Sequence, residues 1–197
     1  MPQRQKSNDI LSPELVKILK IFGLISIGLI LILSFFNTKR ANNTGDDLTF
    51  RISPSSRLYF LNVRAIRYDR EIRSDAGMLL FRHGNRSVSP TEPLLNLVLI
   101  LNSRKEEAYL YLEPESVDWP LELRASSDGE SQEFLLENGN NTQFLAQVRQ
   151  LEPWIAADAD FEIKIDSSWV RIWKEPKELD ALQATLGDYF RLINERE

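Results

Sequence analysis

The longest apolar run in the chain is Ile21–Phe36, sixteen residues without a charge. Basic residues flank it on both sides. Backbone amides in hydrocarbon must be hydrogen-bonded within their own segment, so a run of this kind is helical in a membrane. A bilayer core about 30 Å thick needs roughly 20 helical residues. Leu15–Phe36 supplies twenty-two when its two lysines extend toward the headgroups, so the pattern predicts a single transmembrane helix over 13–36.

Two alternatives to a retained membrane anchor fit the sequence less well. A buried helix of a soluble domain keeps a polar stripe, which this run lacks. A cleaved signal peptide has an apolar region of about 7–15 residues followed by a small-residue cleavage site. The residues after the run, Asn37–Arg40, do not fit that pattern. We therefore expect a signal-anchor helix that begins at Ser12-Pro13-Glu14, because serine caps and proline at the first helical position are typical of helix starts.

The remaining pattern divides the chain into four parts. Residues 1–12 are expected to form a disordered tail, 13–36 the membrane helix, 37–47 a polar linker and 48–197 one soluble domain. A domain of this length buries a sizeable core without disulfides.

Short segments rich in β-branched and aromatic residues predict several strands in the domain. Residues 94–101 are apolar on both faces and are expected to form a buried central strand, whereas the charged residues 69–77 are expected to form a loop. The predicted strands are 48–52, 58–68, 78–82, 94–101, 107–112, 121–125, 132–137, 161–165 and 169–173.

Helical periodicity appears twice, late in the chain. Residues 142–152 carry one apolar face and are expected to end at Pro153, because proline disrupts a helix. Residues 176–194 carry a second apolar stripe and begin at a proline. The expected fold class is therefore α+β: one mainly antiparallel β domain with two late amphipathic helices, following the single membrane helix.

Charge is divided unevenly along the chain. Residues 1–40 hold six basic and two acidic side chains, a net of +4, and the remainder holds 18 basic and 27 acidic ones, a net of −9. An acidic domain argues against nucleic acid as a partner, because phosphate contacts need basic surface. The chain has no cysteine, which excludes disulfides, thiolate metal sites and cysteine nucleophiles.

The side of the membrane on which the domain lies is predicted from two considerations. Four basic residues lie on the N-terminal side of the apolar run Ile21–Phe36 and three lie close behind it, a small difference that favours a cytoplasmic N-terminus. The short tail cannot fold alone, so the anchor serves to display the C-terminal domain. We expect a single-pass protein of the cell inner or plasma membrane, with the domain extracytoplasmic.

Motifs for catalysis, cofactors and metals are missing from the sequence. His83 is the sole histidine and is expected to be an exposed turn residue. No phosphate-binding glycine loop or G-x-S-x-G motif occurs. Asp158-Ala159-Asp160-Phe161-Glu162 alternates acids but lacks the glycine and closing glutamate of a calcium loop. We therefore predict no catalytic, cofactor or metal residue, and no cofactor.

Two groups of side chains are candidates for binding. Between residues 57 and 86 the basic residues are all arginines, whose planar guanidinium suits carboxylate and phosphate partners. They form a candidate patch for an anionic lipid, an acidic glycan or an acidic protein; the alternative is that they pair with acids of the same fold. Trp169 and Trp173, four residues apart on a predicted strand, are candidates for an aromatic contact. The arginines are Arg57, Arg64, Arg67, Arg70, Arg73, Arg82 and Arg86.

These observations favour a binding protein over an enzyme. We expect a membrane-anchored extracytoplasmic interaction module, a subunit or accessory factor of a cell-envelope protein complex. The alternative is an envelope-acting hydrolase that uses two carboxylates, a pair defined by its separation in space. A ligand sensor is less favoured, because a short cytoplasmic tail leaves no output domain.

Overall fold

The computed structural model describes residues 13–35 and 50–194, and for residues 30–35 it describes the backbone alone. The predicted tail, 1–12, and the predicted linker, 37–47, lie outside the described residues.

The chain divides into two compact units, Met1–Arg40 and Ala41–Glu197. In the first unit, helix α1 runs from Pro13 to Phe35 with Glu14 in its first turn. The predicted start at Pro13 coincides with the first described residue of the chain. None of the helices in the described stretches has the length and apolar character needed to cross a membrane.

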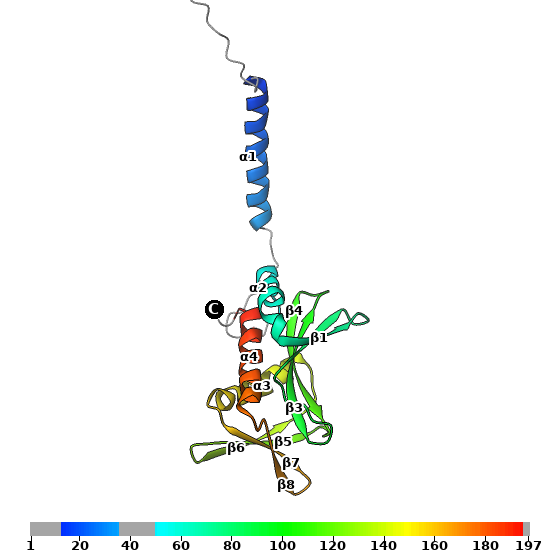
Figure 1. The fold of residues 1–197 in the computed structure, drawn as a ribbon. Coiled ribbons are helices and arrows are strands. Elements are labelled where there is room, and N and C mark those ends of the chain that lie inside the picture. Colours follow the sequence, from blue (N-terminus) through cyan, green and yellow to red (C-terminus); the bar gives the residue numbers. More distant parts are fainter. Residues whose placement is uncertain (1–12, 36–49, 195–197) are drawn as a thin grey trace, which may run out of the picture. The chain divides into compact units, whose positions relative to one another are not determined.

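The second unit is an α+β domain with two antiparallel four-stranded sheets (Figure 1). Its strands are β1 (Tyr68–Arg73), β2 (Met78–His83), β3 (Leu94–Asn102), β4 (Glu107–Glu115), β5 (Leu121–Ser127), β6 (Glu130–Leu136), β7 (Asp160–Ile165) and β8 (Ser168–Ile172). Its helical elements are α2 (Pro54–Tyr59), a π-helical turn η1 (Phe60–Arg64), a 3-10 turn η2 (Ala65–Arg67), α3 (Asn141–Ala156) and α4 (Pro176–Leu192). The α+β prediction is confirmed.

The first sheet has the strand order β1-β2-β3-β4. Its strand β3 is the apolar segment predicted to be central, and it lies between β2 and β4 with eight of its nine residues buried. The β3–β4 hairpin pairs Leu94 with Glu115 and Asn102 with Glu107. The predictions of a buried central strand over 94–101 and of a strand over 107–112 are confirmed.

The second sheet has the order β6-β5-β7-β8. The predicted strand over 161–165 is found as β7, in which Phe161 and Ile163 are buried. It pairs with β5 on one side and β8 on the other, so one face of this sheet also contributes to the core.

Helices α3 and α4 cover the first sheet from the core side (Figure 1). Helix α3 begins with a capping box in which Asn140 and Gln143 bond each other's backbone amides, a common helix start. At the start of helix α4 the Glu175 amide donates to the Glu178 side chain at 3.0 Å, and Pro176 occupies the first helical position. Its buried stripe includes Leu182, Leu186 and Phe190, as predicted from periodicity.

Both sheets and both helices contribute to one apolar core. Trp173 lies just beyond β8, at the junction of the sheets. Its ring packs edge-on against Phe161, with ring centroids 4.8 Å apart. Its Nε1 donates a hydrogen bond to the carbonyl oxygen of Leu95 in β3, 2.6 Å away. This bond joins an edge of one sheet to the middle of the other.

The predicted strand over 58–68 is wrong for all but its last residue, because 58–67 is helical (α2, η1 and η2) and Tyr68 begins strand β1. The Ser53 side chain caps the Ser56 amide at 3.0 Å, and Pro54 occupies the first helical position. This serine–proline start resembles the one at Ser12-Pro13 and outweighs the strand propensity of the aromatic residues that follow. The domain therefore has an early helical element as well as the two late helices.

The predicted loop over 69–77 is also wrong in part, since Tyr68–Arg73 forms strand β1 and pairs with β2. This strand lies at the edge of the sheet and exposes most of its side chains. Charged residues are tolerated there, and even favoured, because they discourage pairing with other chains. Net charge alone is therefore a poor guide to a loop.

Pro153 does not end helix α3, which continues to Ala156. Proline removes one backbone donor from the helix, but Ile155, which is buried, holds the last turn against the core. The predicted strand 48–52 is reduced, within the described residues, to one isolated bridge between Arg51 and Glu107.

Candidate functional site

Most of the seven arginines in the predicted anionic-partner patch bind acids of their own fold. Arg73 lies between Glu71 and Asp75, at 3.3 and 3.8 Å, and Arg86 Nη1 lies 2.6 Å from Asp69. Because these pairs are partly or largely exposed, each contributes little to stability.

Arg82 makes the most extensive of these contacts. Its Nε and Nη2 donate to the two oxygens of Glu113, both at 2.6 Å, and its Nη1 donates to Glu71 at 2.8 Å. These bonds raise the pKa of Arg82, and hydrogen bonding to Arg82 lowers the pKa of Glu71. Since Glu71, Arg82 and Glu113 stand on β1, β2 and β4, the guanidinium fastens three strands together.

Arg64 belongs to a buried network. Its Nε donates to Asp188 Oδ1 at 2.6 Å, and Tyr68 donates its hydroxyl proton to Asp188 Oδ2 at 2.8 Å. The Asp188 side chain is only 3% exposed. The hydrogen bond to Asp188 raises the pKa of Arg64, and burial raises the pKa of Tyr68. The network joins η1, β1 and α4, so its role is to hold the early helical segment onto the domain.

The other three arginines keep more of their capacity to bind. Arg57 donates to the Ser103 hydroxyl at 3.2 Å. Arg67 and Arg70 are exposed, and within residues 13–35 and 50–194 neither forms a salt bridge. The structure thus divides the predicted patch into four paired arginines and three that face other groups or solvent.

His83 is buried, not exposed as predicted, because it ends strand β2 and packs beneath Tyr68, with ring centroids 5.1 Å apart. Its Nδ1 accepts a hydrogen bond from the Asn85 amide at 3.2 Å. Burial, and then the positive charges of Arg67 and Arg64, lower the pKa of His83, against the opposing effect of Asp188.

We expect the stability of the domain to fall as the pH drops through the range below about 6.5, the usual histidine value. A lowered pKa in the folded state means that the unfolded chain binds the proton first, so acid favours unfolding there. His83 is the only histidine, so its NMR titration is unambiguous. A measured pKa at or above 6.5, or an unchanged pH dependence in His83→Gln, would contradict this expectation.

The two tryptophans of the predicted aromatic contact do not share one surface. Strand β8 ends at Ile172, and Trp173 adopts a positive φ of 49°, which breaks the alternation expected of a strand. Trp173 is buried, whereas Trp169 is half-buried beneath the Arg124 guanidinium, 4.3 Å from its ring centroid. Only Trp169 is available to a partner without unfolding.

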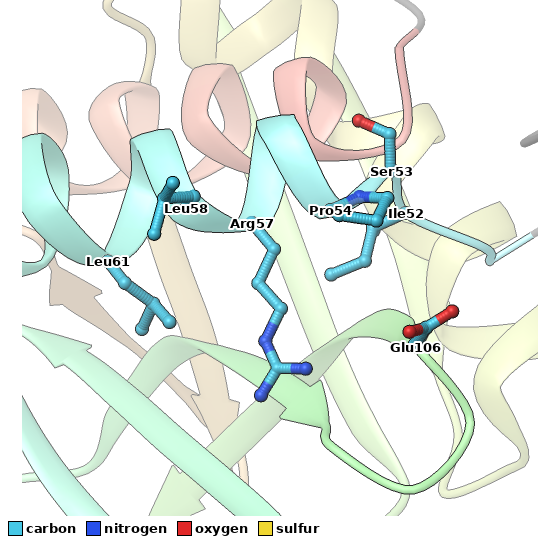
Figure 2. A pocket seen from close by; sticks show the side chains of 7 residues that line it. All are labelled: Ile52, Ser53, Pro54, Arg57, Leu58, Leu61 and Glu106. Atoms are coloured by element: carbon cyan, nitrogen blue, oxygen red, sulfur yellow. The ribbon is translucent and has the colours of Figure 1, made fainter. Parts of the chain in front are cut away.

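A pocket of about 200 Å³ opens between α2, the start of η1 and the β3–β4 turn. Figure 2 shows the Arg57 side chain reaching down across it, with Leu58 and Leu61 on the helix and Glu106 on the turn. The exposed lining is mainly apolar, with a cation and a carboxylate toward the rim. Its residues are Ile52, Ser53, Pro54, Arg57, Leu58, Leu61 and Glu106.

Sequence reasoning missed this pocket except for Arg57. The serine–proline pair at Ser53-Pro54 was the available clue, because it predicts a helix start and so places Arg57, Leu58 and Leu61 on one helical turn. Nothing in the sequence indicated that Glu106, on a distant turn, would face them.

A second pocket, at the start of α4, gathers three glutamates. Glu92 binds Lys174 at 2.8 Å, Glu175 binds Lys177 at 2.7 Å, and Glu178 accepts the Glu175 amide at 3.0 Å. Each of these three carboxylates therefore already binds another group of the same domain. Among the described side chains, no cluster of three or more histidine, aspartate or glutamate residues is arranged to hold a metal ion; the acids of the 158–162 segment bind Gln183, Arg171 and Arg124 instead.

Comparison of the chain with family models, with curated proteins and with solved structures finds no significant match.

Proposed function

We propose that this chain is a membrane-anchored binding module that displays its α+β domain outside the cytoplasm, as a subunit or accessory factor of a cell-envelope protein complex. The observation that carries the proposal is the mainly apolar pocket beside Arg57, which has the composition of a protein-binding site.

The size of the pocket favours a protein partner over a small molecule. Small-molecule sites usually enclose about 300–1,000 Å³, and this pocket is smaller, at about 200 Å³. It would accept one large apolar side chain of a partner, an anchor of the kind that dominates many interfaces. Arg57 at the rim would select a partner that carries a matching negative charge.

The anchor is supported by the apolar run Ile21–Phe36 and by the continuity of helix α1 from Pro13 to Phe35. Large apolar side chains are exposed around the described part of this helix, including Ile18, Phe22, Leu24 and Leu29. A helix that is apolar on every side requires an apolar environment. The side chains of the run beyond Leu29 lie outside the description.

The two-carboxylate hydrolase remains the alternative and would use the pocket of Glu92, Glu175 and Glu178. It receives less support, because a catalytic pair needs carboxylates that can reach substrate and exchange protons, and these three bind lysines or a backbone amide.

The proposed partner site is tested by photo-crosslinking in intact membranes. A crosslinking amino acid at Leu58, which is exposed beside the pocket, is expected to give one discrete protein adduct that disappears when Arg57→Glu is added. The matched control is the same crosslinker at Leu135, an exposed leucine on β6. Equal adducts from both positions, or an adduct from Leu58 that persists in Arg57→Glu, would contradict the proposal.

A further inference from the structure

The outer side of the early helical segment exposes three apolar side chains to solvent. Tyr59 is 40% exposed, Val63 51% and Ile66 88%. They recur three or four residues apart, so they lie on one side of the segment. Phe60, which is 1% exposed, anchors the opposite side in the core. The stripe is also separate from the pocket, whose helical residues are Arg57, Leu58 and Leu61.

Positive charge accompanies this stripe. The sequence from Leu48 to Tyr68 contains no acidic residue, although the domain as a whole is acidic. Arg67 and Arg70 are exposed at its end, and within the described part of the chain neither forms a salt bridge. From helix α4, the exposed Arg191 donates to the Tyr59 hydroxyl at 3.1 Å and adds a third cation.

Nearby carboxylates do not neutralise these cations, because they are already bound. Asp69 pairs with Arg86, Glu71 with Arg82 and Arg73, and Asp188 with Arg64. The surface formed by Tyr59, Val63, Ile66, Arg67, Arg70 and Arg191, called here the 59–70 face, is therefore both apolar and positively charged.

We propose that the 59–70 face docks on the anionic headgroup surface of the bilayer that holds the chain. The proposal rests on the membrane anchoring proposed above. An arginine guanidinium binds two phosphate oxygens at once. Aromatic and aliphatic side chains insert at the boundary between headgroups and acyl chains. An exposed set of both kinds fits such a surface.

The length of chain that precedes the face supports this occupant over a soluble one. Fourteen residues, 36–49, separate helix α1 from the first described residue of the domain. A chain extends by at most about 3.5 Å per residue, so Phe50, at the start of the described domain, stays within roughly 50 Å of the end of the anchor. Tethering at this distance gives the bilayer a high effective concentration at the face, and an acidic surface elsewhere on the domain would be repelled by the same lipids.

The test uses the full chain in lipid nanodiscs with a fluorophore at a single cysteine. The protein has no native cysteine, so Ile66→Cys carries the only label, at a site exposed enough to accept it. With phosphatidylglycerol present we expect a blue shift of the emission and quenching by spin-labelled acyl chains. In phosphatidylcholine alone, and in Arg67→Glu/Arg70→Glu with either lipid, both effects are expected to be lost. A label at Leu135→Cys serves as the matched control and is expected to stay in water throughout.

The outcomes distinguish failure of the docking proposal from failure of the membrane anchor. A label at residue 66 that stays water-exposed in anionic nanodiscs overturns the docking proposal while leaving the anchor intact. Failure of the full chain to enter nanodiscs overturns the anchor instead, and anionic vesicles added to the same labelled chain then test the face directly. A blue shift without quenching by lipid spin labels points to contact with protein and also overturns the lipid proposal.

Discussion

Replacing Asp188 by alanine is expected to lower the free energy of unfolding by about 3 kcal/mol, the usual effect of breaking a buried ion pair from one side. Asp188 is nearly inaccessible and binds both Arg64 and Tyr68. Its removal leaves a guanidinium charge and a buried hydroxyl without their acceptor, and the loss comes mainly from these desolvated groups. Urea unfolding at neutral pH measures the change.

Two further variants separate the network from the helix that carries it. Asp180→Ala removes an exposed aspartate of the same helix α4 and is expected to change stability by less than about 0.5 kcal/mol. Adding Arg64→Met to Asp188→Ala is expected to recover part of the loss, because the uncompensated charge is gone. If Asp188→Ala matches Asp180→Ala, the network does not hold the early segment in place.

Replacing Trp173 by alanine is expected to lower the free energy of unfolding by about 4 kcal/mol, within the range for large aromatic side chains in a core. The ring fills the junction between the sheets against Phe161, and its Nε1 satisfies the Leu95 carbonyl. Trp173→Phe keeps part of the packing but leaves that carbonyl without its donor, so it is expected to lose about 1–3 kcal/mol.

The matched control is Trp169→Ala, which removes the other tryptophan of the same hairpin. Trp169 is only half-buried and stacks with Arg124, so this change is expected to lower stability by less than about 1 kcal/mol. Thermal or denaturant unfolding compares the two variants. Equal losses would mean that Trp173 is not the side chain that joins the sheets.

Periodicity predicted the parts of the fold whose burial follows a simple pattern. The run 94–101 is apolar on both faces and forms the interior strand β3, and the stripe of Leu182, Leu186 and Phe190 forms the buried side of α4. In both cases the spacing of the apolar residues allows only one way for the segment to bury them, as an interior strand or as a helix with one buried side.

Segments with conflicting local preferences were predicted less well. Residues 58–68 carry the side chains of a strand but follow a serine–proline helix start, and the contacts of Phe60 with Phe81 and Tyr68 then keep them helical. The charged strand β1 and the last turn of α3 depend on neighbours that the local sequence does not reveal: β2 for the strand, and the core around Ile155 for the helix.

The candidate sites were only partly predictable, for the same reason. Arg64 pairs with Asp188, which lies 124 residues later in the chain, on α4. Sequence spacing therefore predicts neither this pair nor the fact that Arg67 and Arg70 lack such a partner among the described residues. The pocket beside Arg57 needs Glu106 of a distant turn. Such groupings arise from tertiary packing, and the sequence contains only their members.

The binding pocket and the 59–70 face both gain their proposed roles from a domain tethered to a membrane and held outside the cytoplasm. Reporter fusions at the C-terminus, one active only outside the cytoplasm and one only inside, measure this directly in cells. We expect activity from the outside reporter alone, in the membrane fraction. Activity from the inside reporter alone would contradict the extracytoplasmic placement and direct the search for partners to the cytosol.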